Sequence, residues 1–190
     1  MRKVLTILIL ISGILNVSAY SSDEKLAADF LSYKDVINTQ EEAKNYELDK
    51  EITRREMAKI TLKLSEKNIS NSCNWTFDDL KSWDWGCKYA EEWLKYSFFA
   101  KNTNFNPNSN ISKIEALKMI IKARNIKKED TTDWRVWYVN AWVKAGILEK
   151  SFSDFDTKAT RWWIFKMWQH SIEYSWTDED IDIINKLLNP

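Results

Sequence analysis

A helix-start pattern recurs along this chain and limits what the chain can fold into. Residues 52–56 read Ile-Thr-Arg-Arg-Glu, and residues 111–115 read Ile-Ser-Lys-Ile-Glu. In each, the Ser or Thr can accept from the backbone three residues on while the Glu reaches back, which is a capping box. Residues 159–161 repeat the start of the pattern, without the Glu. The sequence predicts three similar helix starts, with caps at Thr53, Glu56, Ser112, Glu115 and Thr160.

A second similarity covers the segments between these starts. Asp84-Trp85 corresponds to Asp133-Trp134, and Tyr89 follows the first pair at the same distance as Tyr138 follows the second. Similarity at a period of about 50 residues implies one supersecondary unit used about three times. We expect these units to cover about residues 25–70, 75–126 and 131–174.

The apolar pattern within the units is helical. Met57, Ile60 and Leu64 recur with the spacing of one helix face. Tyr138 and Trp142 belong to a similar face, and alternation typical of strands is nearly absent. A last short helix is expected over residues 177–188. We therefore predict an all-α fold.

The middle unit resembles a known family. The resemblance rests on Phe77-Asp78-Asp79, Trp85, Tyr89, Phe98, Phe105-Asn106-Pro107 and residues 111–115. In these residues the chain is similar to the S-layer homology (SLH) domain, whose pattern runs from Phe-x-Asp through an aromatic helix and an aromatic-x-Pro turn to Ile-Thr-Arg-x-Glu. The third unit keeps Tyr138, Gly146 and Thr160-Arg161, and the first keeps mainly residues 46–64. The resemblance implies three helical repeats around a pseudo-threefold axis, with the short helix after them.

The resemblance also implies where a ligand binds. In SLH domains similar to this one, the Arg of the helix start lies in a groove between repeats and helps to bind an anionic cell-wall polysaccharide, often a pyruvylated sugar. The corresponding candidates for glycan binding are Arg54, Lys113, Arg161, Asp78, Trp85 and Trp134. Arg grips a carboxylate with a planar fork, whereas Lys offers a point charge. Because Trp163 replaces the Glu of the third box, the motif favours the Arg54 groove. The alternative is that each cation is a solvated surface charge or pairs with a nearby carboxylate.

The beginning of the chain has the layout of an export signal. Met1-Arg2-Lys3 precedes an apolar run from Val4 to Val17, and Ser18-Ala19 follows. We expect residues 1–19 to be a signal peptide, leaving residues 20–190 as one SLH-like domain. The alternative is an uncleaved anchor, although the run is short for a membrane span of about 20 residues. Export places the protein at the cell surface or in the cell wall.

Cys73 and Cys87 are the only cysteines. In an exported chain two such cysteines favour a disulfide, and the alternative is two free thiols. We expect no metal site, because the only histidine is His170 and the cysteine spacing fits no zinc pattern.

Tryptophan is abundant and glycine scarce, with 11 Trp and 3 Gly. Trp93, Trp142, Trp162, Trp163 and Trp168 stand where the family usually has a small residue or Glu. One interpretation is an aromatic-rich core. The other is that some of these codons are read as a different residue, such as Gly, in the source organism.

Composition and motifs exclude several functions. The 28 basic residues balance the 28 acidic ones, whereas nucleic-acid binding favours a basic surface. Phosphate-binding glycine loops, nucleophile elbows and histidine clusters are absent from the sequence. We therefore expect a non-catalytic protein without a cofactor, which attaches to cell-wall polysaccharide and associates with itself or other envelope proteins. The alternative is an exported scaffold that binds a protein partner through apolar helix faces.

Overall fold

The computed structural model describes residues 21–126, 133–148 and 150–173. The expected signal peptide and the expected helix over residues 177–188 lie outside this part. The elements are α1 (Ser22–Tyr33), η1 (Ala43–Tyr46), α2 (Arg54–Leu64), α3 (Cys87–Lys95), α4 (Lys113–Ala123), α5 (Trp134–Lys144) and α6 (Arg161–Glu173). Apart from three isolated bridges, the regular structure of the described residues is helical. The prediction of an all-α fold is confirmed.

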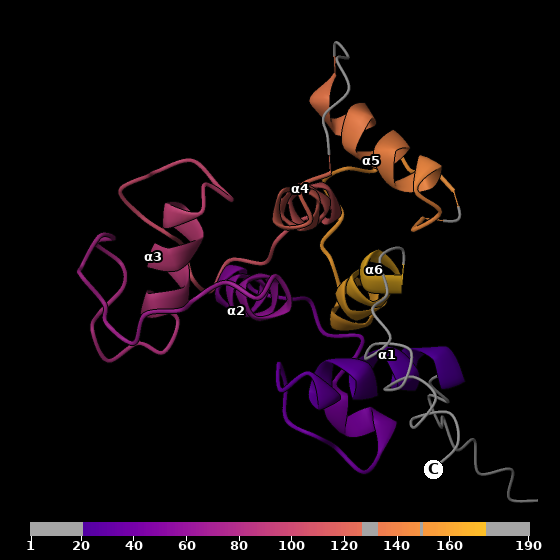
Figure 1. The fold of residues 1–190 in the computed structure, drawn as a ribbon, viewed down its shortest axis with the longest axis horizontal. Coiled ribbons are helices and arrows are strands. Elements are labelled where there is room, and N and C mark those ends of the chain that lie inside the picture. Colours follow the sequence, from indigo (N-terminus) through magenta and orange to yellow (C-terminus); the bar gives the residue numbers. More distant parts are fainter. Residues whose placement is uncertain (1–20, 127–132, 149, 174–190) are drawn as a thin grey trace, which may run out of the picture.

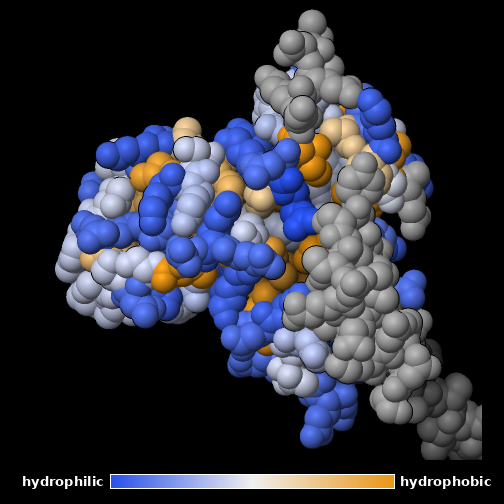
Figure 2. All heavy atoms as spheres, in the orientation of Figure 1, coloured by the Kyte–Doolittle hydropathy of each residue, from blue (hydrophilic) through white to orange (hydrophobic). Residues whose placement is uncertain are grey.

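Helices α2, α4 and α6 lie at the centre of the molecule, and α3, α5 and α1 lie outside them (Figure 1). Each outer helix packs against one inner helix, α3 on α2, α5 on α4 and α1 on α6. The first described helix therefore packs against the last one, which joins the two ends of the described chain. The exposed face seen in Figure 2 is mainly hydrophilic, with hydrophobic side chains in small separate patches.

The segments that precede the inner helices form a ring of backbone hydrogen bonds. Ile52 N–H donates to Ala159 C=O at 2.9 Å, Ile111 N–H to Ile52 C=O at 3.1 Å, and Ala159 N–H to Ile111 C=O at 3.0 Å. All three residues are buried. This ring agrees with the expected repeats around a pseudo-threefold axis, which remain a prediction.

The core is unusually rich in tryptophan. Trp93, Trp137, Trp142 and Trp168 are at most 2% exposed. Each buries its indole Nε1 without a hydrogen-bond partner among the described residues. Buried tryptophans usually find such a partner, because a buried unpaired donor costs about 1–3 kcal/mol. Trp93, Trp142 and Trp168 are three of the positions at which the sequence left open a different residue.

Candidate functional site

The three candidate cations occupy the same position in their helices. Arg54, Lys113 and Arg161 each begin an inner helix directly after its expected cap. The backbone N–H of each donates at 2.9 Å to a carbonyl of a neighbouring segment, at Ser109, Thr157 and Lys50 respectively. The backbone thus places a cation at each of three junctions.

Arg54 is held at the junction of α2 with the turn before α4. Its Nε donates to Phe105 C=O at 2.8 Å, and its guanidinium carbon lies 5.2 Å from the centre of the Phe105 ring and 5.6 Å from that of Phe99. The side chain is 16% exposed, and its Nη1 lies 4.0 Å from Glu115 Oε1. Burial lowers the pKa of Arg54, while Glu115 and Asp79 oppose that shift. Among the described residues, the one ion pair of its terminal nitrogens is therefore the 4.0 Å contact with Glu115.

Arg161 is bound more tightly at the junction of α6 with α2. Nη1 donates to Tyr46 C=O at 3.2 Å and to Glu47 Oε2 at 2.8 Å, and Nη2 donates to Glu56 Oε1 at 2.8 Å. The other Glu56 oxygen, Oε2, accepts from Thr53 N–H at 2.8 Å and from the Thr53 hydroxyl at 2.7 Å. Burial raises the pKa of Glu56, but the bonds from Thr53 and Arg161 outweigh this and leave it below its usual value.

The same carboxylate geometry recurs at α4 with a longer ion-pair contact. Glu115 Oε2 accepts from Ser112 N–H at 2.9 Å and from the Ser112 hydroxyl at 3.1 Å, which completes the second capping box. Its Oε1 faces Arg54 only at 4.0 Å. The capping boxes of α2 and α4 therefore cap their helices in the same way. They differ at the Oε1 atom of the glutamate, which binds Arg161 closely in Glu56 and lies 4.0 Å from Arg54 in Glu115.

Lys113 lies at the third junction, beside Trp163. Its Nζ is 5.9 Å from the centre of the Trp163 ring, which is a cation–π distance. Trp163 takes the place of the Glu that would complete a box with Thr160. At the junction where the cation is Lys113, the indole of Trp163 therefore occupies the position that a glutamate carboxylate occupies at the other two junctions.

A cavity of about 310 Å³ contains Arg161. Its lining includes Tyr46, Glu56, Lys59, Trp85 and Arg161, which we call the Arg161 groove. Trp85 is 47% exposed, and the Arg55 guanidinium lies 5.5 Å from the centre of its ring. Burial and the neighbouring Lys63 lower the pKa of Lys59. Its ammonium makes no hydrogen bond or ion pair with another described residue.

A second cavity of about 250 Å³ contains Lys113. Its lining includes Lys113, Lys150, Trp163, Lys166 and His170, which we call the Lys113 groove. The remaining lining residues are Leu148, Ser151, Phe152, Trp162 and Met167. Half of these residues lie on α6, so one helix supplies half of the described wall.

The other two expected residues lie elsewhere. Asp78 is exposed and lines a shallow pocket with Lys101 and Thr103, which shares no residue with either groove. Trp134, 44% exposed, has the Lys118 ammonium 5.1 Å from its ring centre. The structure thus brings Trp85 together with Arg161, but places Asp78 apart from both.

Sequence reasoning missed three lysines. Lys59, Lys118 and Lys166 follow Thr53, Ser112 and Thr160 at equal distances in the sequence. Lys59 and Lys166 line the two grooves, and Lys118 lies over Trp134. Comparing the three helices beyond their first turn would have shown this repeated cation.

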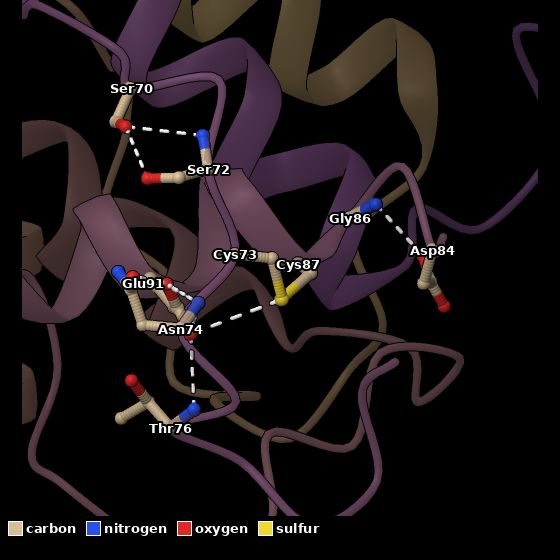
Figure 3. Close-up of a disulfide and its surroundings, with 9 residues drawn as sticks. All are labelled: Ser70, Ser72, Cys73, Asn74, Thr76, Asp84, Gly86, Cys87 and Glu91. Atoms are coloured by element: carbon tan, nitrogen blue, oxygen red, sulfur yellow. Dashed lines mark hydrogen bonds between the residues drawn. A yellow bond between two sulfur atoms is a disulfide. The ribbon is translucent and has the colours of Figure 1, made fainter. Parts of the chain in front are cut away.

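Cys73 and Cys87 form a disulfide, with their Cα atoms 5.7 Å apart (Figure 3). Glu91 lies beside it and accepts from Asn74 N–H at 2.8 Å and from Thr76 N–H at 3.0 Å. Glu91 and the two sulfurs are close enough together to suggest a metal site. Because the sulfurs are bonded to each other, they are not thiolate ligands. The arrangement closes the loop that carries Trp85.

Residues 76–117 match the family model of the S-layer homology domain. The match spans α3 and the start of α4, including Trp85 and Lys113. An SLH domain suggests attachment to the cell envelope and implies association with the cell surface. No curated protein matches the chain. Among the described residues, the helices are too short or too polar to cross a membrane.

Proposed function

We propose that this protein, once exported, attaches to the cell envelope by binding an anionic wall polysaccharide through three SLH-like repeats. The SLH match over residues 76–117 supports the class of function. The ring that joins Ile52, Ile111 and Ala159 supports the extension of the repeat to the whole domain. The role is binding rather than catalysis.

The Arg161 groove is the observation that carries this proposal. Lys59 and Arg161 give it positive charge, and Trp85 offers an exposed ring face beside them. A sugar ring can lie on such an indole while its carboxylate faces the Lys59 ammonium. Arg161 is already bonded to Glu47 and Glu56, so Lys59 is the cation with more capacity for a ligand.

The test is retention on purified wall polysaccharide at several salt concentrations. Lys59→Gln should weaken retention at least tenfold, since a hydrogen bond to a charged group contributes about 1.5–3 kcal/mol. Trp85→Ala should also weaken retention, because it removes the ring face on which the sugar lies. Trp83→Ala is the matched control, because Trp83 is 79% exposed, lies on the same loop and is not part of the groove. Equal losses for Trp85→Ala and Trp83→Ala, or no loss for Lys59→Gln, would argue against the groove.

Arg54→Ala is a less selective test than the motif suggests. Arg54 holds the Phe105 carbonyl and packs on two phenylalanine rings, so its removal should also destabilise the fold. Wall retention of this variant has to be compared with its stability. A loss of retention that exceeds the loss of folded protein would support a glycan contact at Arg54.

A protein partner is a second candidate function. Trp75 and Trp83 are 57% and 79% exposed, and both lie in the loop closed by Cys73 and Cys87. Exposed indoles are common in protein interfaces. If Trp75→Ala and Trp83→Ala abolish capture of an envelope protein while wall polysaccharide is not retained by the wild type, the scaffold function is favoured.

A further inference from the structure

The surroundings of the disulfide place a carboxylate beside the two sulfurs (Figure 3). Glu91 Oε1 lies 4.0 Å from Cys73 Sγ and 3.9 Å from Cys87 Sγ. In a tetrahedral zinc site, with Zn–S about 2.3 Å and Zn–O about 2.1 Å, a sulfur and an oxygen ligand lie about 3.6 Å apart. The carboxylate is therefore close to the position from which it could share a zinc ion with both sulfurs.

Two of these three side chains come from one helix. Cys87 begins α3 and Glu91 follows it by four residues, so both lie on the same face of the helix. Cys73 joins them from the preceding loop, and its Cα atom lies 5.7 Å from that of Cys87. The spacing of the cysteines in the sequence did not indicate a metal site, because the third group is a glutamate one helical turn away.

The loop around Cys73 is also held by bonds other than the disulfide. On one side of Cys73, Asn74 N–H donates to Glu91 at 2.8 Å. On the other side, Ser70 N–H donates to the neighbouring Glu92 at 3.3 Å. Both bonds tie the loop to α3. Breaking the S–S bond should therefore leave the Cys73 thiol close to the other two groups.

The Glu91 carboxylate can accept a metal ion beside its hydrogen bonds. Asn74 N–H lies 2.8 Å from both of its oxygens, so Oε2 alone can accept this bond. The two donors of Asn74 and the N–H of Thr76 use three of the roughly four lone-pair sites of an ionised carboxylate. Cys87 is buried, whereas Cys73 is partly exposed and gives an ion a way in.

We propose that the reduced protein binds Zn²⁺ through Cys73, Cys87 and Glu91. A dithiol reductant supplies two electrons and two protons, which convert the disulfide into two thiols while the reductant becomes a disulfide. Zn²⁺ then displaces both thiol protons to the solvent and forms two Zn–S bonds and one Zn–O bond, with water as the fourth ligand. Zinc suits this set because it accepts both thiolate and carboxylate ligands. The ion holds the loop that carries Trp85 in place of the disulfide.

The experiment titrates the full chain with Co²⁺ in the absence of oxygen, after reduction with dithiothreitol and its removal by gel filtration. Co²⁺ enters tetrahedral zinc sites and reports a bond to thiolate by a charge-transfer band in the near ultraviolet. The reduced protein should bind one Co²⁺ per chain with this band, and Zn²⁺ should displace it. The oxidised protein should show no such band, since both of its cysteines are in the disulfide.

Variants separate the ligands from the residues that only hold the loop. Glu91→Gln and Cys73→Ser should each weaken Co²⁺ binding about tenfold or more, because each replaces an anionic ligand with a neutral one. Glu92→Gln is the matched control, since Glu92 also holds the loop but is not part of the ligand cluster. Its affinity for Co²⁺ should stay close to that of the wild type.

Two outcomes would overturn the inference. The first is a reduced wild type that shows no thiolate band with Co²⁺. The second is an affinity of Glu91→Gln equal to that of Glu92→Gln, because the carboxylate would then not be a ligand. Neither measurement involves a glycan, so the proposed function stands or falls separately by wall retention.

Discussion

The Arg161–Glu56 corner and the Lys113–Trp163 corner have corresponding backbones and different chemistry. At both, the first residue of an inner helix donates its N–H at 2.9 Å to a neighbouring segment. At one, a guanidinium meets a carboxylate at 2.8 Å, and at the other an ammonium lies 5.9 Å from an indole centre. The backbone contact therefore persists while both side chains change together.

The comparison shows that the cation at the start of an inner helix can stabilise the junction by pairing with a carboxylate, or can stay more available to a ligand. Arg161 and Glu56 satisfy each other, so their pairing stabilises the junction and leaves less charge for a ligand. Lys113 and Trp163 join α4 to α6 through a weaker contact, in which the ammonium faces a ring instead of a carboxylate. The motif favours the Arg positions for binding, whereas the side-chain contacts favour Lys59.

The largest effect on stability is expected from removing the Glu56 carboxylate, which both completes the capping box of α2 and binds Arg161. Glu56→Ala should lower the free energy of unfolding by about 3 kcal/mol, because it removes a cap and a bond to Arg161. Glu115→Ala removes the same cap but only a 4.0 Å contact to Arg54, so its expected cost is about 1 kcal/mol. Denaturant unfolding of both variants measures the difference. Equal costs would show that the Arg161 pair adds nothing to the cap.

A smaller effect on stability is expected from the coupling between residues 113 and 163. Trp163→Glu should destabilise the protein, because it places a carboxylate at a position that is 7% exposed. Lys113→Arg in the same chain should recover about 1 kcal/mol by supplying a fork for that carboxylate. A double-mutant cycle by denaturant unfolding gives the coupling energy. Additive effects would mean that Lys113 and Trp163 do not face each other as described.

The smallest effect is expected in how stability depends on pH. The pKa of Glu56 lies below its usual value of 4.5 in the folded protein, so its charge contributes stability above that pH. This contribution is lost as pH falls through the folded pKa. The stability difference between wild type and Glu56→Gln should therefore shrink below about pH 4.5. Thermal unfolding at several pH values checks the trend, and a difference that grows on acidification would contradict it.

The helix starts could be predicted from the sequence because they depend on residues close together in the chain. Thr53 and Glu56 meet within one turn, and so do Ser112 and Glu115. The pairing of Arg161 with Glu56 could not be predicted in this way, since it joins residues far apart. The placement of Asp78 away from the grooves likewise depends on how its loop bonds to Thr103.

The tryptophans of the core mark a second limit of sequence reasoning. Trp93, Trp142 and Trp168 are buried with unpaired indole nitrogens, which neither interpretation of the tryptophan count anticipated. Peptide mass spectrometry of the protein from its own source distinguishes the interpretations. Tryptophan at these positions would establish the aromatic core, and a smaller residue would establish a different reading of the codon.

The hydrogen-bonded ring of Ile52, Ile111 and Ala159 has a consequence for how the domain unfolds. In a linear array of repeats, a terminal unit can fray because it has one neighbour. Here each of the three segments donates one bond and accepts another, so releasing any one of them breaks two of the three bonds. Helix α1 adds to this closure by packing against α6. The inner helices should therefore melt in one concerted transition, and a pull on the anchored domain would meet resistance from all three segments together.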